Sequence, residues 1–190
     1  MGSTIRGWLT VWLTLLCLPA SAADPWDALR QGGVLILMRH AVTEPGTGDP
    51  PGFRVDDCTT QRNLSRQGRE QAQRLGAMFA ARGVQPVAVF SSAWCRCQDT
   101  GKLAFPAVPV RHLPALDSLF MDNSREPAQT AYLRDALQRI PRSGVTVWVT
   151  HQTNATALTG EFLGMGEALI LRPEGDGKFR ALGRLRPPEP

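Results

Sequence analysis

Two apolar runs of this sequence each end abruptly in residues that are suited to chemistry. The run Val34–Met38 is followed by Arg39 and His40, and the run Val145–Thr150 is followed by His151. Apolar runs without polar alternation are typical of parallel strands that are buried on both faces. In open α/β sheets the ligand binds beyond the carboxyl ends of such strands. These runs therefore predict a buried sheet with an active site at one end.

A second arginine follows a third apolar run in the same way. This run ends at Ser91 and Ser92, and Arg96 lies a few residues further along the chain. If the three runs are neighbouring strands, two arginines and two histidines meet at the same end of the sheet. Arginine is well suited to hold the oxygens of a phosphoryl group, and histidine can attack its phosphorus. The pattern indicates a site for a phosphoryl group.

The rest of the chain alternates between segments that favour strands and segments that favour helices. We expect further strands near 87–91 and 108–110 and a terminal hairpin of 167–171 and 178–185. We expect helices between 24 and 32 and near 66–82, 94–103, 124–140 and 153–163. This alternation predicts a single α/β domain with three α/β/α layers, doubly wound, around a mainly parallel sheet. The long stretch 41–63 begins beside His40, so we expect a functional loop there.

The first 22 residues have the pattern of a secretory signal. A short basic segment, 1–6, precedes an apolar stretch, 7–18, and Ala20-Ser21-Ala22 supplies the small residues that a signal peptidase reads. Cleavage after Ala22 would leave residues 23–190 as a mature domain that is secreted or periplasmic and not inserted in a membrane. The alternatives are a retained anchor, for which the apolar stretch is short, and a lipid anchor on Cys17, which the large Leu16 before it disfavours.

The charge and the cysteines of the chain agree with an exported domain. The formal net charge is +4 and is spread along the chain, which argues against nucleic acid as a partner. Cys58, Cys95 and Cys97 follow the signal, so an oxidising compartment would leave one disulfide and one free thiol. We expect Cys58 to pair with Cys95, because both flank loops near the predicted site, whereas Cys95 and Cys97 would close a strained ring. The cysteines and histidines match no trusted zinc spacing.

Three motifs at predicted strand ends, and the helix that follows the first of them, occur in a familiar order. These segments are Leu37–Ala41, Ser91-Ser92 with Arg96 and Thr100, Val149–His151, and 62–72. In this order they resemble the histidine phosphatase superfamily, the group that includes the phosphoglycerate mutases, over nearly all of the mature chain. The resemblance implies a doubly wound fold and a covalent phosphohistidine intermediate, with no metal or other cofactor.

The resemblance also implies roles for individual residues. His40 would be the nucleophile, with its attacking nitrogen unprotonated and its ring oriented through the other nitrogen. Arg39 and Arg96 would bind the non-bridging oxygens and offset charge in the transition state. His151 would donate a further hydrogen bond to a phosphoryl oxygen. Water would then hydrolyse the phosphohistidine.

Two residues beside the motifs are further candidates for the phosphate pocket. Arg62 lies in a polar segment before the long helix and would add a third cation or contact the substrate. Its alternative role is to pair with an acid at the base of the loop. Thr43 lies close to the nucleophile in the chain and would lend its hydroxyl to the phosphate.

The chain departs from the family pattern at two positions. Ala41 stands where the family usually has glycine, which is acceptable unless the position needs a positive φ. Gln152 stands where the acid phosphatase branch has the aspartate that protonates the leaving group. The mutase-like branch takes this acid from the segment after the second arginine, which makes Asp117 the first candidate, with a turn or capping role as its alternative. The other candidates are Glu44, Glu161 and Glu167.

The sequence therefore predicts an exported phosphatase that hydrolyses a phosphomonoester or a similar small phosphorylated compound through His40. A mutase fits less well, because it must retain its phosphorylated intermediate and its usual metabolites are cytosolic. The alternatives are a non-catalytic phosphate- or phosphosugar-binding protein on the same fold and a phosphatase of phosphohistidine proteins. We expect the loops 43–63 and 113–125 to select the substrate, and we expect a monomer.

Overall fold

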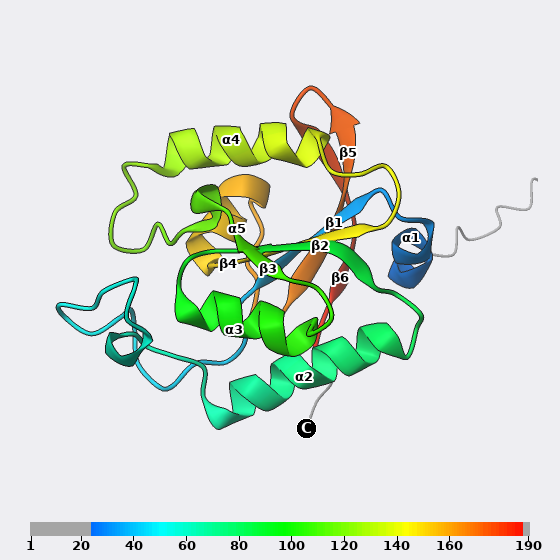
Figure 1. Ribbon diagram of the computed structural model, residues 1–190. Coiled ribbons are helices and arrows are strands. Elements are labelled where there is room, and N and C mark those ends of the chain that lie inside the picture. Colours follow the sequence, from blue (N-terminus) through cyan, green and yellow to red (C-terminus); the bar gives the residue numbers. More distant parts are fainter. Residues whose placement is uncertain (1–23, 188–190) are drawn as a thin grey trace, which may run out of the picture.

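The computed structural model describes residues 24–187 of the chain (Figure 1). The predicted signal, 1–22, lies outside these residues and stays a prediction. Within 24–187, no helix is both long and apolar enough to cross a membrane.

A six-stranded sheet forms the centre of the described structure, with its strands in the order β3-β2-β4-β1-β5-β6. The four strands β3, β2, β4 and β1 are all parallel to one another. Strand β5 is antiparallel to β1, and β6 is antiparallel to β5. The predicted mainly parallel sheet and the terminal hairpin are therefore confirmed. The strands are β1 (Val34–Arg39), β2 (Pro86–Ser91), β3 (Val110–His112), β4 (Val145–Thr150), β5 (Ala168–Gly175) and β6 (Lys178–Leu185).

Helices cover both faces of the sheet and complete the three predicted layers. Figure 1 shows α2 and α3 below the sheet and α4 and α5 above it. In β1, Val34, Ile36 and Met38 pack in the core on the α2 side. Leu35 and Leu37 pack in the core on the α4 side, which explains why this run shows no polar alternation. The helices are α1 (Pro25–Gln31), α2 (Arg66–Ala80), α3 (Cys95–Ala104), α4 (Glu126–Gln138) and α5 (Gln152–Thr159).

Element boundaries follow local signals in the sequence. The Ser65 hydroxyl accepts a hydrogen bond from the Gly68 amide and caps the start of α2, as its position predicts. Helix α5 is shorter than the expected 153–163, because Gly160 takes a left-handed conformation with φ 76° that ends it. Strand β3 begins later than expected, since Pro109 has no amide proton for a sheet hydrogen bond.

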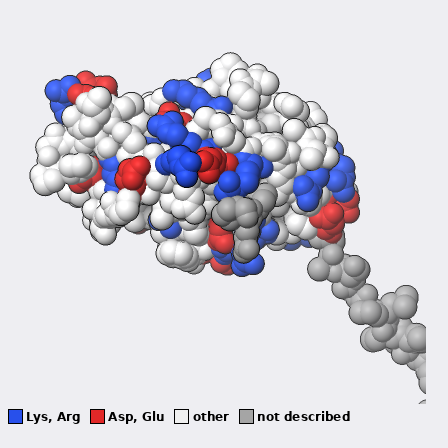
Figure 2. Space-filling view, turned by 90° about the horizontal axis from the view of Figure 1, so that it is seen from below, with Lys and Arg blue, Asp and Glu red and all other residues white. Residues whose placement is uncertain are grey.

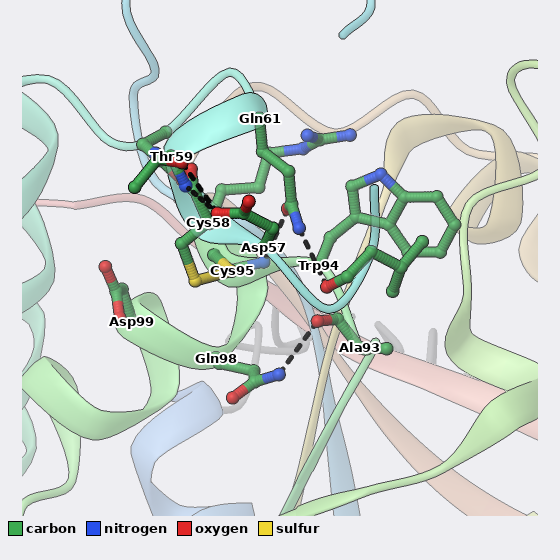
Figure 3. Close-up of a disulfide and its surroundings, with 12 residues drawn as sticks. Asp57, Cys58, Thr59, Gln61, Ala93, Trp94, Cys95, Gln98 and Asp99 are labelled. Atoms are coloured by element: carbon green, nitrogen blue, oxygen red, sulfur yellow. Dashed lines mark hydrogen bonds between the residues drawn. A yellow bond between two sulfur atoms is a disulfide. The ribbon is translucent and has the colours of Figure 1, made fainter. Parts of the chain in front are cut away.

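The loop 41–63 lies beyond the end of β1 and is tied to the start of α3. Figure 3 shows the tie, a disulfide between Cys58 and Cys95, which is the predicted pairing. Cys97 is a free, buried thiol, also as predicted. Apart from a 3₁₀ turn (Cys58–Thr60) and short bridges, the loop has no regular structure. A long irregular segment is therefore fixed to a helix of the core.

The surface on the α2 side carries charges of both signs. Basic and acidic side chains are interspersed on the face that Figure 2 shows. Residues of α2 contribute ion pairs, including Arg66 with Glu70 and Arg69 with Asp99. This face therefore lacks the continuous basic stripe that is typical of a nucleic-acid site.

Candidate active site

The strand register brings the two motif histidines together. Arg39 at the end of β1 pairs with Thr150 at the end of β4. The next residues, His40 and His151, therefore leave the sheet side by side, and the centroids of their rings are 5.5 Å apart.

A cavity of about 340 Å³ opens at this end of the sheet. Its lining includes both histidines and the arginines Arg39, Arg62 and Arg96, so these predicted residues surround one space. Other lining residues come from the loop 41–63 and from the segments after β3, after β4 and before β5. They are Gly46, Thr47, Gly48, Ser118, Phe120, Gln152, Thr153 and Met165.

The ring of His40 is held in one tautomer by its own loop. The residue is 3% exposed, and its Nδ1 lies 2.9 Å from the carbonyl oxygen of Ala41. A carbonyl oxygen only accepts, so Nδ1 carries the proton and Nε2 keeps its lone pair. Burial lowers the pKa of His40 to about 3; the Ala41 contact opposes this shift, and Arg96 and Arg39 add to it. The imidazole is therefore neutral near pH 7 and has a nitrogen that can act as a nucleophile.

Three arginines that line the cavity carry unsatisfied donors. The Nε atoms of Arg39, Arg62 and Arg96 are buried and have no hydrogen-bond partner within residues 24–187. Buried donors are usually satisfied, and these three suit the oxygens of an anion. Burial and then the charges of Arg62 and Arg96 lower the pKa of Arg39. Burial and then Arg96 lower the pKa of Arg62, while Asp49 opposes this shift. A bound anion would offset the repulsion among the three arginines. Each arginine also donates through Nη1: Arg39 to the Leu163 carbonyl at 2.9 Å, Arg62 to the Gly46 carbonyl at 2.7 Å, and Arg96 to the Asp49 carboxylate at 2.7 Å.

The second histidine of the cavity, His151, is also buried and neutral. Its Nε2 lies 2.9 Å from the Ser92 hydroxyl and 3.5 Å from the Cys97 sulfur. The Ser92 hydroxyl accepts from the Trp94 amide and can donate its own proton to Nε2, which leaves the Nδ1–H of His151 for a phosphoryl oxygen. Burial and then the nearby His40 keep the pKa of His151 well below its usual value.

Thr43 does not line the cavity, unlike Arg62. Its side chain is buried, its hydroxyl lies 3.8 Å from the sulfur of Met165, and its backbone pairs with Leu64. The predicted contact of its hydroxyl with phosphate therefore has no support in the geometry. Ala41 fits its position, because Asp176 is the only non-glycine residue of the described chain with a positive φ.

The predicted acid, Asp117, is held outside the cavity lining. Its Oδ1 accepts hydrogen bonds from the Ala93 amide at 2.7 Å and from His112 Nε2 at 3.0 Å. The adjacent Ser118 lines the cavity instead. The sequence could place Asp117 in the correct segment, but it could not indicate which neighbouring side chain faces the site.

The three other candidates for the acid, all glutamates, do not line the cavity either. Glu161 and Glu167 pair with Arg184 at 3.0 and 2.8 Å. Glu44 is exposed and lines an adjoining surface hollow, which shares Arg62 and residues 46–48 with the cavity. Within residues 24–187, no carboxylate is among the residues that line the cavity.

The structure also places Asp49, which no motif in the sequence indicated, against the arginines. Its side chain is 4% exposed and accepts hydrogen bonds from Arg96 Nη1, Trp94 Nε1 and the Arg62 amide. Burial alone raises the pKa of Asp49, but these hydrogen bonds and the charge of Arg96 hold the pKa below its usual value. Its only sequence signal was a position in a loop rich in Gly and Pro, where aspartate is typical of turns.

The cavity combines a neutral imidazole nucleophile with convergent positive charge. Three guanidinium charges and the one carboxylate of Asp49 leave a formal charge of +2, which complements a phosphate dianion. Within 24–187, no three His, Cys, Asp or Glu side chains are grouped so as to hold a metal ion. This set of donors suits phosphoryl oxygens rather than a cation.

The fold and the site together define an α/β domain in which two paired histidines and three arginines line one cavity. A sequence model of the histidine phosphatase superfamily (branch 1) matches residues 35–126, which include His40 and the three arginines. The chain belongs to the histidine phosphatase superfamily. No curated protein matches it.

Solved structures share this fold at low sequence identity. A candidate α-ribazole-5′-phosphate phosphatase of Escherichia coli K-12 is 18% identical, with a TM-score of 0.59 over 78% of this chain and 94% of that one. The protein histidine phosphatase SixA, complexed with tungstate, is 14% identical, with a TM-score of 0.57 over 80% and 96%. A mycobacterial glucosyl-3-phosphoglycerate phosphatase, complexed with VO3, is 17% identical, with a TM-score of 0.55 over 79% and 97%.

Proposed function

We propose that this protein is an exported phosphatase that hydrolyses a small phosphomonoester through a phosphohistidine on His40. The arrangement around His40 carries the proposal: its unprotonated Nε2 belongs to a cavity lined by three arginines whose buried Nε donors have no hydrogen-bond partner within residues 24–187. Donors that are fixed in this way stabilise the charge that develops on phosphoryl oxygens in the transition state.

The reaction consists of two displacements at phosphorus. In the first, the Nε2 lone pair of His40 forms a P–N bond while the P–O bond to the leaving group breaks, and the released oxygen keeps the electron pair and takes up a proton. In the second, water attacks phosphorus and loses a proton, the P–N bond breaks, and its electron pair returns to Nε2. Arg39, Arg62 and Arg96 bind the non-bridging oxygens in both steps, and His151 donates to one of them.

Two features support export. Residues 1–22 have the pattern of a cleaved signal. The disulfide between Cys58 and Cys95 is of the kind that persists in an oxidising compartment. We therefore place the reaction outside the cytosol.

The cavity lining favours a second candidate, a phosphatase of phosphohistidine proteins. Since no described carboxylate lines the cavity, an alkoxide leaving group would have to take its proton from solvent. An imidazole leaving group can be protonated on its other nitrogen near neutral pH before the P–N bond breaks. Comparing kcat/KM for a phosphohistidine peptide, an alkyl phosphate and an aryl phosphate separates the two candidates. A much lower value for the alkyl phosphate than for the other two would favour the second.

Turnover of 4-nitrophenyl phosphate by wild type and His40→Ala tests the nucleophile. We expect the variant to lose at least about 1,000-fold in kcat/KM, because it lacks the nitrogen that forms the P–N bond of the proposed intermediate. Rapid quenching and mass spectrometry should find phosphate on His40. The matched control is His112→Ala, which removes the third histidine of the chain, an exposed residue outside the cavity. Persistent turnover in His40→Ala would refute the assignment, and phosphate binding without turnover in wild type would favour a non-catalytic binding protein.

A further inference from the structure

The loop 41–63 contacts three consecutive residues at the start of α3. Trp94 Nε1 donates to Asp49 at 3.0 Å, Cys95 forms the disulfide with Cys58, and Arg96 Nη1 donates to Asp49 at 2.7 Å. Figure 3 shows the disulfide that Cys95 forms and the neighbouring Trp94. The loop is therefore bound to the turn of helix that carries a phosphate-binding arginine.

Asp49 determines which edge of the Arg96 guanidinium is left for a ligand. It binds Nη1, and within residues 24–187 neither Nε nor Nη2 of Arg96 makes a hydrogen bond. An edge with two parallel N–H groups can bind a phosphoryl group in a bidentate manner. Without a countercharge, Arg96 would be repelled by Arg39 and Arg62 and would lose this orientation.

A continuous set of contacts links the disulfide to Asp49. Gln61, near Cys58 in the loop, accepts from the Cys95 amide through Oε1 at 3.0 Å. The next amide along the chain, that of Arg62, donates to Asp49 Oδ1 at 3.0 Å. The disulfide thus holds the end of the loop that in turn holds the carboxylate.

We propose that Asp49 is a positioning residue that orients Arg96 for phosphoryl transfer, and that the disulfide between Cys58 and Cys95 keeps Asp49 in place. The proposal rests on the proposed function. It adds a carboxylate that acts through an arginine rather than on the substrate.

Removing the charge of Asp49 should have two opposing effects. The cavity becomes more positive, which favours any bound phosphate anion. At the same time Arg96 loses its fixed direction, which weakens interactions that depend on the geometry of the transition state. A positioning role therefore predicts that kcat/KM and the binding of a transition-state mimic fall together, while the binding of inorganic phosphate changes little. Loss of structure alone would weaken both ligands.

The test compares Asp49→Asn with wild type. We expect kcat/KM for 4-nitrophenyl phosphate to fall about 10- to 100-fold and the calorimetric Kd of vanadate to rise by a similar factor. The Kd of inorganic phosphate should change less than about threefold. Asp49→Glu, which restores the charge one carbon further out, should recover part of the loss. The matched control is Asp56→Asn, an exposed aspartate of the same loop, which should change none of the three values.

Cys58→Ser, measured without reductant, tests the second part of the proposal. In this variant, too, the Kd of vanadate should rise while the Kd of inorganic phosphate changes little. Adding Asp49→Asn to it should lower kcat/KM less than about threefold further, because both changes release the same arginine. If the loss of kcat/KM in the double variant instead equals the product of the losses in the two single variants, the link between the disulfide and Asp49 is overturned.

Three results distinguish this proposal from the function on which it rests. An unchanged kcat/KM in Asp49→Asn, or equal weakening of phosphate and vanadate in folded variants, would overturn the positioning role. Turnover that persists in His40→Ala would instead overturn the proposed function. The two calorimetric Kd values still test Asp49 in that case, since ligand binding needs no turnover.

Discussion

Loss of the disulfide should lower the free energy of unfolding by about 4 kcal/mol. Cys58 and Cys95 are 37 residues apart in the chain, and the closure entropy of a loop of this length corresponds to about 3.8 kcal/mol at 25 °C. The loop that the bond closes contains α2 and β2, whose apolar residues lie in the core. The chain therefore gains this freedom only when the core opens, so the change should appear in global unfolding.

Thermal unfolding of Cys58→Ser measures this change. For a domain of this size we expect a fall of roughly 8–15 °C in Tm. Cys58 is the residue to replace, because it is exposed whereas Cys95 is buried and would add a loss of packing. Wild type that has been fully reduced should melt at the same temperature as the variant. A fall below about 4 °C would refute the loop-closure argument, because it would mean that the unfolded chain is already restrained without the bond.

Three further predictions concern the cavity. The pKa of His40 is about 3 in the folded protein and near 6.5 in the unfolded chain, so below pH 6.5 the unfolded state binds a proton that the folded state does not. The free energy of unfolding should then fall by up to about 1.4 kcal/mol per pH unit as the pH drops toward 3. Plotted against pH, the free energies of unfolding of wild type and His40→Asn, obtained from melting curves, should have different slopes in this range. Equal slopes would contradict the lowered pKa of His40. Phe120 lines the cavity and is 53% exposed, so Phe120→Ala should raise KM for 4-nitrophenyl phosphate about 2- to 10-fold but not KM for glycerol phosphate; Tyr132→Ala, an exposed aromatic on α4, is the control. EDTA should leave kcat/KM unchanged, and a loss that added metal restores would show that the proposed two-step chemistry is incomplete.

The strand ends are the part of this protein that the sequence predicts best. An unbroken apolar run can be satisfied only by burial on both faces, and the polar residues that follow such a run must emerge at the end of the sheet. This reasoning predicts that His40 and His151 lie close together, and the structure places them side by side. The disulfide was predictable for a related reason, because Cys58 and Cys95 both flank segments that approach this end.

The irregular segments were less predictable, because a side chain there can point in any direction. Asp49 and Asp117 both lie in such segments, and the sequence favoured Asp117 as the residue near the chemistry. In the structure, Asp117 is held by the Ala93 amide and His112, whereas Asp49 pairs with Arg96. Periodicity determines the facing of residues in helices and strands, but no comparable rule applies to a loop that is positioned by one covalent bond and a few tertiary contacts.

The two histidines directly follow β1 and β4, the two middle strands of the sheet. The walls of the cavity, in contrast, come largely from segments that contribute no strand to the sheet. Changes of length or composition in 43–63 or 113–125 would alter which molecules gain entry, while the reacting atoms would stay where they are. A domain of this kind can acquire new specificities in evolution by exchanging its surface segments, without having to rebuild its catalytic apparatus each time.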